Sequence, residues 1–532
     1  MKRIFKKIYI SVICISTLMA CEVVDFDLQE NPNLLNPTSS DPNFLLNELQ
    51  FLFQDIMGDM ILNTDDVMRY ESLTGTYNDE VDPDVLRTEW ERYFEALSIA
   101  RVIETQAASD PGLTFHNAIS KLLLGYLTVT LVDYNGAIPF SQAAMSEEFP
   151  NPVLDDGADL YTMVLADIDQ AIIDINASTN DVTNDLFYNN NRDRWEAFAN
   201  SFKLRLLIQT RLASGEVGVA DIQSQINALL NSNIIDTEAE DFQYNFTAVN
   251  EPESRHPYFV RGYLSGFSQY IGNYFMFTLR FSKNVIDPRI RYYLYRQSDV
   301  DPFSGPPFLA CQGDPEVDFC FVGDQYWGLD HGETRTGRGD NFLRTVYGVY
   351  PGGGTFDEDQ FDRGANTVNS GGAGILPLLT SSYIKFLSAE AALMLNTNGD
   401  PVTLLEEAIR NSMNKVLNFG NVNSSLEPTA ADVDAYVAEV IANYTAATSN
   451  EERLDIIITE FYLAAYGNSI ESYNAYRRTG FPSSIQESIS GDVNFPRSFP
   501  YSDEEVNLNS SISQKQNTVR VFWDTNPEGF IN

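Results

Sequence analysis

Positive charge is scarce in this 532-residue sequence. It has 34 Lys and Arg residues against 75 Asp and Glu residues, which gives a net charge of −41. A field of this sign repels nucleic acids and anionic membrane surfaces, so both are excluded as binding partners. Apolar residues are not scarce, since 43% of the chain is hydrophobic and 12% is aromatic. The sequence therefore predicts a globular protein with a large core and not a disordered acidic chain.

Catalytic motifs are also missing. The sequence has no GxSxG nucleophile elbow, no HExxH zinc motif and no GxxxxGK[ST] phosphate loop. Its three histidines, His116, His256 and His331, lie far apart, and we expect hydrogen-bonded or surface residues rather than ligands of one metal. Acidic pairs are numerous, but nothing selects one pair for glycoside hydrolysis. The residues therefore give no positive support for an enzyme, and we assign no catalytic residue, no metal site and no cofactor.

Two further patterns are too weak to assign as sites. Arg338-Gly339-Asp340 spells an RGD tripeptide, which is expected by chance in a Gly-rich loop. The acidic run Asp357-Glu358-Asp359, with Asp362, is spaced partly like a calcium loop but lacks the full EF-hand pattern. A solvated acidic turn is the favoured interpretation, and structural calcium is the alternative.

Only four cysteines are present, and two of them lie near the N-terminus. Four basic residues among the first seven are followed by an apolar stretch that is too short to span a bilayer. Leu18-Met19-Ala20-Cys21 then resembles a bacterial lipobox. We predict a signal peptide over residues 1–20, cleavage after Ala20, a lipid on Cys21, and a tether over residues 21–41 that is rich in Asn, Pro and Ser. The alternative is an ordinary secretory signal with a coincidental cysteine.

Two cysteines remain in the mature chain, Cys311 and Cys320, at the ends of the segment CQGDPEVDFC. Export places them in an oxidising compartment, where a local disulfide that closes this loop is expected. A metal pair is the alternative, but it lacks a second group of Cys or His residues nearby. Loss of the four cations of the signal peptide would bring the net charge of the mature chain to −45.

Helical periodicity recurs on both sides of a less regular middle. Apolar residues between 159 and 175 form the stripe of an amphipathic helix. Asp193 and Glu196 predict a capping box at the start of another helix, Asp400-Pro401 predicts the start of a third, and Asn450 is the expected cap of a fourth. The pattern is that of helices joined by short turns.

From about residue 245 to 375 this periodicity fades, and Gly, Pro, Asp and aromatic residues dominate. A long irregular segment inside a helical protein is often a functional surface. We therefore predict a mainly α fold in which tetratricopeptide-like helix pairs form a frame around a large loop-rich insert. The expected single domain spans 42–532, with N-terminal helices over 42–244, the insert over 245–375 and C-terminal helices over 376–532.

Aromatic residues in polar loops are the candidate ligand contacts. Flat rings among Asp, Asn and Arg suit sugars, because the C–H faces of a sugar stack on the rings while its hydroxyl groups form hydrogen bonds. The alternative is that these rings hold their own loops together. The predicted ligand-binding residues are Tyr70, Tyr77, Tyr326, Trp327, Tyr347 and Tyr350.

Several stretches together resemble the SusD/RagB family of outer-membrane lipoproteins of Bacteroidetes, in its SusD-like branch. They follow the order of the family along nearly the whole mature chain, although each alone is weak. They are DFDLQENPNLLNPTSSDPNFLLNELQ (25–50), LVDYNGAIPFSQA (131–143), RWEAFANSFKLRLLIQTRL (194–212), VIDPRIRYYLY (285–295), LLTSSYIKFLSAEAAL (378–393) and IESYNAYRRTGFP (470–482).

The resemblance implies a helical, tetratricopeptide-containing protein that binds a nutrient at the cell surface and closes as a lid over a SusC-like TonB-dependent transporter. It also implies that the protein performs no chemistry, and we predict that it is not an enzyme. It implies an outer-membrane location facing the exterior, and Glu22, Asp25 and Asp27 resemble the acidic tails that direct such lipoproteins outward. Among the family motifs, Arg205 and Glu390 lie on amphipathic helices, where a buried ion pair or a helix cap would explain them. No ligand contact is carried over from the family.

An oligosaccharide is the expected nutrient. A peptide or another nutrient is the alternative within the family. Two alternatives belong to other classes: a surface adhesin, and a secreted glycoside hydrolase with two carboxylates facing each other across a cleft.

Overall fold

The computed structural model describes residues 40–264, 269–301, 311–315, 317–334, 343–362, 369–491, 494–527 and 529–531. The predicted signal peptide, the lipidated Cys21 and nearly all of the tether lie outside these residues, as does the RGD tripeptide at 338–340.

The fold is mainly helical, as predicted. The helices are α2 (Pro42–Asp65), α3 (Tyr77–Glu80), α4 (Arg87–Ser109), α5 (Thr114–Asn135), α6 (Gly157–Ala177), α7 (Arg192–Gln209), α8 (Ile222–Leu230), α9 (Pro257–Phe259), α10 (Asn273–Phe281), α11 (Ile290–Tyr293), α12 (Ser381–Leu395), α13 (Pro401–Leu417), α14 (Ala430–Ala446), α15 (Asn450–Ala464), α16 (Ser469–Thr479) and α17 (Asp503–Leu508). The strands are β1 (Phe242–Asn245), β2 (Leu294–Arg296), β3 (Thr345–Tyr347) and β4 (Ile375–Leu379).

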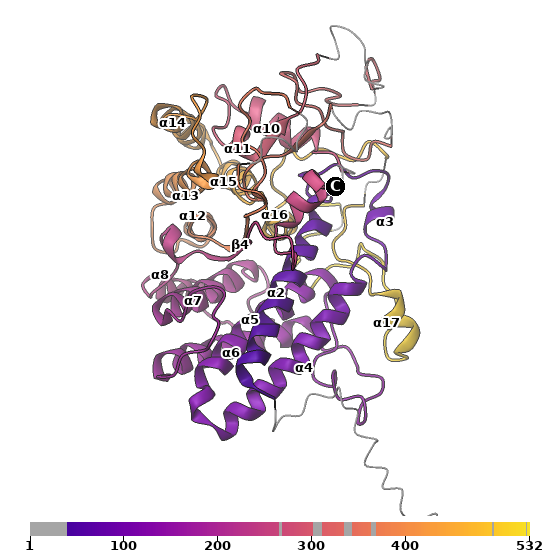
Figure 1. Ribbon diagram of the computed structural model, residues 1–532, viewed down its shortest axis with the longest axis vertical. Helices are drawn as coiled ribbons and strands as arrows, with labels where there is room; N and C mark the ends of the chain where they lie inside the picture. Colours follow the sequence, from indigo (N-terminus) through magenta and orange to yellow (C-terminus); the bar gives the residue numbers. More distant parts are fainter. Residues whose placement is uncertain are drawn as a thin grey trace, which may run out of the picture. The chain divides into compact units, whose positions relative to one another are not determined.

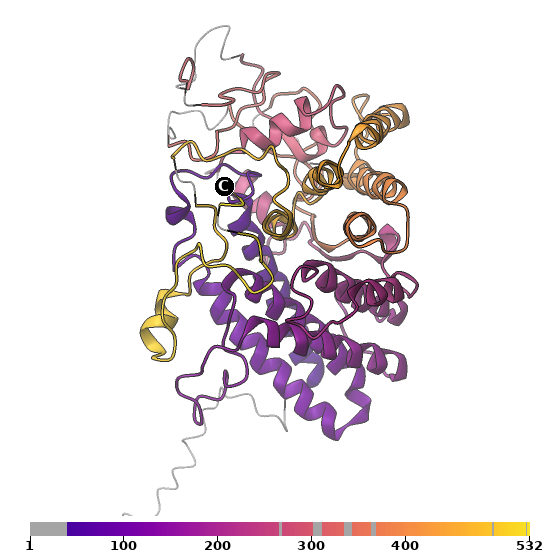
Figure 2. The ribbon, with the colours of Figure 1, turned by 180° about the vertical axis from the view of Figure 1, so that it is seen from behind.

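Helices that follow each other in the chain pack side by side. One series runs from α4 through α5 and α6 to α7, and a second runs from α12 through α13 and α14 to α15. In Figure 1 the first series lies low in the view and the second lies above it in orange, and Figure 2 shows the same two groups from behind. Helix α12 contacts α7, and α16 contacts α2, so the two series share one core.

Polar caps decide where these helices begin. Asp400 accepts a hydrogen bond from the backbone N–H of Thr403 at the start of α13, as predicted. The other two predicted caps are wrong by one or two residues. Asn191 caps α7 ahead of Asp193, and Ser449 forms a capping box with Glu452 at the start of α15. Neighbouring polar residues compete for a cap position, so periodicity locates a helix more reliably than its first residue.

Helix α5 lies at the centre of the first series. With the turn before it, it is long and apolar enough to cross a membrane, but 83% of its most apolar window is buried inside the protein. It is in contact with α2, α4 and α6. Its apolar composition is therefore explained by neighbouring helices, which remove its side chains from water.

The ends of the middle segment meet in a two-stranded sheet. Strand β1 pairs with β4 in antiparallel register, with Tyr244 opposite Leu376. Inside the segment, β2 pairs with β3, and the remaining described residues form short helices and loops. The two ends of the segment thus meet at one place, and described residues between them also pack against the helices: Arg289 donates to the Ser412 hydroxyl on α13, and the Tyr293 hydroxyl donates to the carbonyl of Leu463 on α15.

The two residues expected to be structural are buried in ion pairs. Arg205 Nε lies 2.6 Å from Glu471 Oε1. Glu390 pairs with Arg478 at 2.7 Å and with Arg211 at 2.8 Å, and its side chain has no exposed surface. These charges join α7, α12 and α16, which are far apart in sequence, and the prediction of a structural role is confirmed.

Candidate functional site

The structure buries all six aromatic side chains that the sequence analysis selected. None of them exposes more than 4% of its surface, so none presents an open ring face. Their role as ligand contacts stays a prediction. The contacts described below favour the alternative, in which these rings hold their own loops in place.

Tyr70 and Tyr77 pack against the C-terminal part of the chain. The ring of Tyr70 stacks on Tyr462 with 4.7 Å between the ring centroids, and its hydroxyl lies 2.6 Å from the Ser472 hydroxyl. The Tyr77 ring makes an edge contact with Phe495 at 5.8 Å between the ring centroids, and its hydroxyl accepts a hydrogen bond from the buried guanidinium of Arg69 at 2.7 Å. Both tyrosines therefore tie the segment that follows α2 to elements about 400 residues away.

Tyr347 and Tyr350 are enclosed by other aromatic residues. Tyr347 stacks on Tyr258 with centroids 4.3 Å apart and planes only 6° from parallel, and its hydroxyl donates to the Glu71 carboxylate. Tyr350 makes an edge contact with Phe419 at 5.3 Å. Stacked and edge contacts of this kind stabilise a core.

Tyr326 and Trp327 lie closer to the surface but are also covered. The Tyr326 ring has the guanidinium carbons of Arg280 and Arg296 at 5.3 and 5.0 Å from its centroid. The Trp327 indole N–H donates to the carbonyl of Val300 at 3.3 Å. The two guanidinium groups therefore occupy the space beside the Tyr326 ring that a sugar would need for stacking.

The Cys311–Cys320 disulfide is present, with Cα atoms 5.5 Å apart. The loop that it closes is held at its second end by the carboxylate of Asp330, which is fully buried. This carboxylate accepts backbone N–H groups from Asp318, Phe319 and Cys320 at 2.9, 2.9 and 3.2 Å. A covalent link and a buried acceptor thus fix the backbone around Phe319.

The acidic run that could suggest calcium is paired with arginines instead. Asp357 accepts from Arg296 Nε at 2.6 Å, and Asp359 accepts from Arg291 at 2.9 Å. Within the described part of the chain, no group of three or more His, Cys, Asp or Glu residues has the arrangement of a metal site. Asp357 is thus buried in its ion pair, whereas Asp359 is paired but 40% exposed and Asp362 is exposed, so the expected solvated turn holds for part of the run.

The three histidines are buried and hydrogen-bonded. His116 Nε2 lies 3.0 Å from Asn43 Oδ1, and His331 Nε2 lies 3.2 Å from the Tyr77 hydroxyl. His256 Nδ1 accepts the backbone N–H of Tyr258 at 3.0 Å, and burial lowers the pKa of His256 to about 3. This imidazole stays neutral at physiological pH and serves as a structural acceptor.

Aromatic rings do reach the surface beside the disulfide loop, on residues that the sequence analysis did not select. Phe281, the last residue of α10, is 51% exposed. Phe277 lies one turn earlier, with 5.6 Å between its ring centroid and that of Phe281. The ring centroid of Phe319, in the disulfide loop, lies 4.7 Å from that of Phe277. We call Phe277, Arg280, Phe281, Phe319 and Asp324 the Phe281 surface; α10 is labelled near the top of Figure 1.

Charged groups border these rings. The Arg280 guanidinium carbon lies 4.6 Å from the centroid of Phe281, and the guanidinium pairs with the carboxylate of Asp324. The Asp324 side chain is 67% exposed. Burial lowers the pKa of Arg280, while Asp324 favours its charged form. The Arg280 side chain itself is only 6% exposed and packs against part of the Phe281 ring. The surface thus combines the exposed part of the Phe281 ring, which can stack on C–H groups, with the exposed carboxylate of Asp324, which can accept hydrogen bonds from hydroxyl groups.

The sequence contains no clear signal for this surface. Helix α10 reads NYFMFTLRF, which is apolar on nearly every side, and a helix of this kind is normally read as core. Its neighbours Phe275 and Met276 are indeed fully buried. Only the packing of α10 shows that the face with Phe277 and Phe281 is left open.

Two protein-family models match the chain. A family described as "Starch-binding associating with outer membrane" matches residues 32–305, which is more than half of the chain. A family described as "Susd and RagB outer membrane lipoprotein" matches residues 339–521. No curated protein matches the chain.

Solved structures with the same fold are numerous. A SusD/RagB family protein from Bacteroides thetaiotaomicron has a TM-score of 0.70 at 18% identity, over 92% of this chain and 100% of that one. A chitin-binding SusD homologue from Flavobacterium johnsoniae has a TM-score of 0.64 at 17% identity, over 91% and 100%. A chitin-binding protein has a TM-score of 0.67 at 18% identity, over the same shares. At such identities the similarity establishes the fold alone.

Proposed function

The chain belongs to the SusD/RagB family of outer-membrane lipoproteins, and we propose that it captures an oligosaccharide at the cell surface. The observation that carries this proposal is the exposed aromatic group on α10 and the disulfide loop. Two of the solved structures with this fold are described as chitin-binding, which supports a glycan as the ligand class.

Rigidity is what suits the Phe281 surface to glycans. Each contact with a sugar contributes little binding free energy. A site that became ordered only on binding would lose much of this free energy to the entropic cost of ordering. Here Phe277 and Phe281 stand on a helix, and Phe319 is held by the disulfide and by the buried Asp330 carboxylate. The rings are therefore positioned before the ligand arrives.

The family supports the rest of the proposed role. We propose that Cys21 carries the lipid anchor, that the protein faces the cell exterior, and that it delivers its ligand as the lid of a SusC-like TonB-dependent transporter. Binding without chemistry agrees with the lack of catalytic motifs in the sequence. The mature charge keeps the chain away from anionic surfaces, so contact with the membrane is assigned to the lipid alone.

Calorimetric titration tests the glycan assignment. The mature chain with Cys21→Ser is titrated with soluble chitin oligosaccharides, other soluble polysaccharides and peptides, and reducing ends are assayed in the same samples. We expect saturable binding of one glycan without new reducing ends. Phe281→Ala should weaken that binding about tenfold, because a stacking surface is lost.

Phe44→Ala is the matched control. Phe44 is 77% exposed on α2, outside the Phe281 surface, so its removal should leave glycan affinity unchanged. Binding of peptides alone would assign a different nutrient, and new reducing ends would assign a glycoside hydrolase. Equal affinities of Phe281→Ala and the parent chain would move the binding site elsewhere.

A further inference from the structure

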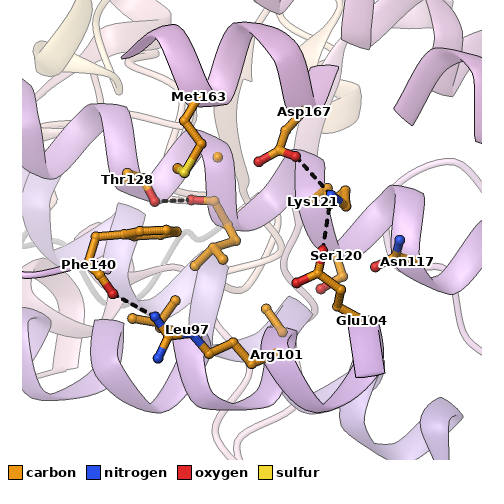
Figure 3. A pocket seen from close by; sticks show the side chains of 13 residues that line it. Leu97, Arg101, Glu104, Asn117, Ser120, Lys121, Thr128, Phe140, Met163 and Asp167 are labelled. Carbon is orange, nitrogen blue, oxygen red and sulfur yellow. Dashed lines mark hydrogen bonds and ion pairs between the residues drawn. The ribbon is translucent and has the colours of Figure 1, made fainter. Parts of the chain in front are cut away.

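A cavity of about 250 Å³ lies between α4, α5 and α6, away from the elements of the Phe281 surface. Small residues create this space. Ala100 on α4 and Ser120 and Gly125 on α5 line it, and a Cβ on Gly125 would approach a methyl group of Val164 to 3.1 Å. Figure 3 shows the side chains of the three helices around this cavity, with Phe140 on one side of it.

One end of the cavity carries an excess of negative charge. Lys121 Nζ lies 2.8 Å from the Asp167 carboxylate and 3.3 Å from the Glu104 carboxylate, as the dashed lines in Figure 3 show. Two carboxylates therefore share a single ammonium group, which leaves one negative charge on the three residues. Asn117 Oδ1, also on the lining, is buried and has no hydrogen-bond partner in the described part of the chain.

The other end carries the positive charge of Arg101, whose charged form the carboxylates of Glu104 and Asp155 favour from beyond ion-pair distance. Arg101 donates to the backbone carbonyl of Phe140 at 2.6 Å and also to that of Ala143. Among the residues that the structure describes, no carboxylate lies within ion-pair distance of this guanidinium. Neutral carbonyl groups do not balance its charge, so an anionic group that entered the cavity would find a partner there.

Between the two ends the walls are apolar. Leu97, Leu124 and Met163 line the cavity together with the ring of Phe140. We propose that this cavity binds a free α-amino acid with an aliphatic side chain. The ammonium group faces Glu104 and Asp167, the carboxylate faces Arg101, and the side chain contacts the apolar wall. The volume suits one small molecule, and the separated charges match a zwitterion.

Two related ligand classes fit less well. An amino sugar would satisfy the negative end but would leave Arg101 without an anion. A simple fatty or sugar acid would satisfy Arg101 but would bring a second negative charge toward Glu104 and Asp167. This site is separate from the proposed glycan surface, so either proposal can fail alone.

The test uses L-leucine with the mature chain carrying Cys21→Ser, in calorimetry and thermal unfolding. N-acetyl-L-leucine lacks the ammonium group, and L-leucinamide lacks the carboxylate. We expect saturable binding of L-leucine with a rise in the unfolding temperature, and at least about tenfold weaker binding of each derivative. Equal binding of the three compounds, or no saturation by L-leucine up to about 10 mM, would overturn the proposal.

Variants locate the site. Ala100→Met fills the cavity without changing any charge, and Arg101→Gln removes the cation; both should lower leucine affinity at least about tenfold. Arg410→Gln, which removes a surface arginine from α13, and Phe281→Ala should leave it unchanged. Circular dichroism checks that each variant folds. Unchanged leucine affinity in a folded Ala100→Met variant would place the amino acid outside this cavity.

Discussion

Several charged residues in this protein lie where their chemical type alone would not predict them. Charged side chains lie in the core: Arg205, Glu390, Glu471 and Arg478 are all nearly or fully buried. Each has an oppositely charged partner, because an unpaired buried charge is costly. Sequence motifs predicted a structural role for Arg205 and Glu390. Their ion-pair partners could not be predicted, because these partners lie elsewhere in the sequence.

Glu390 gives a test at this scale. Glu390→Gln would leave the guanidinium groups of Arg211 and Arg478 buried without their carboxylate, which should cost about 3–5 kcal/mol of unfolding free energy. Denaturant titration measures this loss. The matched control is Glu406→Gln, which breaks an exposed pair with Arg410 and should cost less than about 0.5 kcal/mol. Equal effects of the two substitutions would contradict the structural role.

The same carboxylate predicts a pH dependence. Although burial opposes it, pairing with the two arginines lowers the pKa of Glu390 to about 2, from an ordinary value of 4.5. A lowered pKa in the folded state stabilises the fold above the unfolded-state pKa. That contribution should be lost as the pH falls from about 4.5 to about 2, and the Gln variant should lack this part of the acid transition.

At the scale of elements, the loop between Cys311 and Cys320 connects fold and proposed function. The disulfide closes a short loop, and the buried Asp330 carboxylate accepts hydrogen bonds from the backbone of the same loop. Phe319 then meets Phe277 of α10. A loop without regular structure thereby acquires a fixed aromatic side chain.

Removal of the disulfide tests this arrangement. A Cys311→Ser, Cys320→Ser double variant should lose about 2–3 kcal/mol of unfolding free energy, as expected for a cross-link across a loop of this length. Its helical content should remain, because the helices pack on one another elsewhere. Glycan affinity should fall, since Phe319 is no longer held in place. Unchanged glycan affinity in the folded double variant would show that the loop does not take part in binding.

At the scale of the whole molecule, two helical series share one core, and the two ends of the long middle segment meet in the β1–β4 sheet. The strong negative charge provides solubility and gives no attraction to an anionic membrane. Membrane attachment is therefore expected to depend on the lipid.

Cys21→Ala tests the anchor. Without the thiol no lipid can be attached at this position, and we expect the protein to lose its membrane association and its labelling by radioactive palmitate. Fractionation of cells that express the parent chain and the variant measures the difference. Cys14→Ala, within the predicted signal peptide, is the control and should leave both readouts unchanged. A Cys21→Ala protein that is still labelled by palmitate, or a parent chain that takes no label, would refute the assignment.

Local sequence patterns were enough to predict the helical class, the family and the favoured pairing of Cys311 with Cys320. Periodicity and capping residues are local properties, and two cysteines nine positions apart have few other partners. The sequence by itself did not determine which aromatic rings are covered. Tyr326 lies in a polar loop yet is enclosed by arginines, whereas Phe281 lies on an apolar helix yet faces solvent. The covering of Tyr326 comes from Arg280 and Arg296, which belong to other elements, so the folded structure was needed to distinguish these two rings.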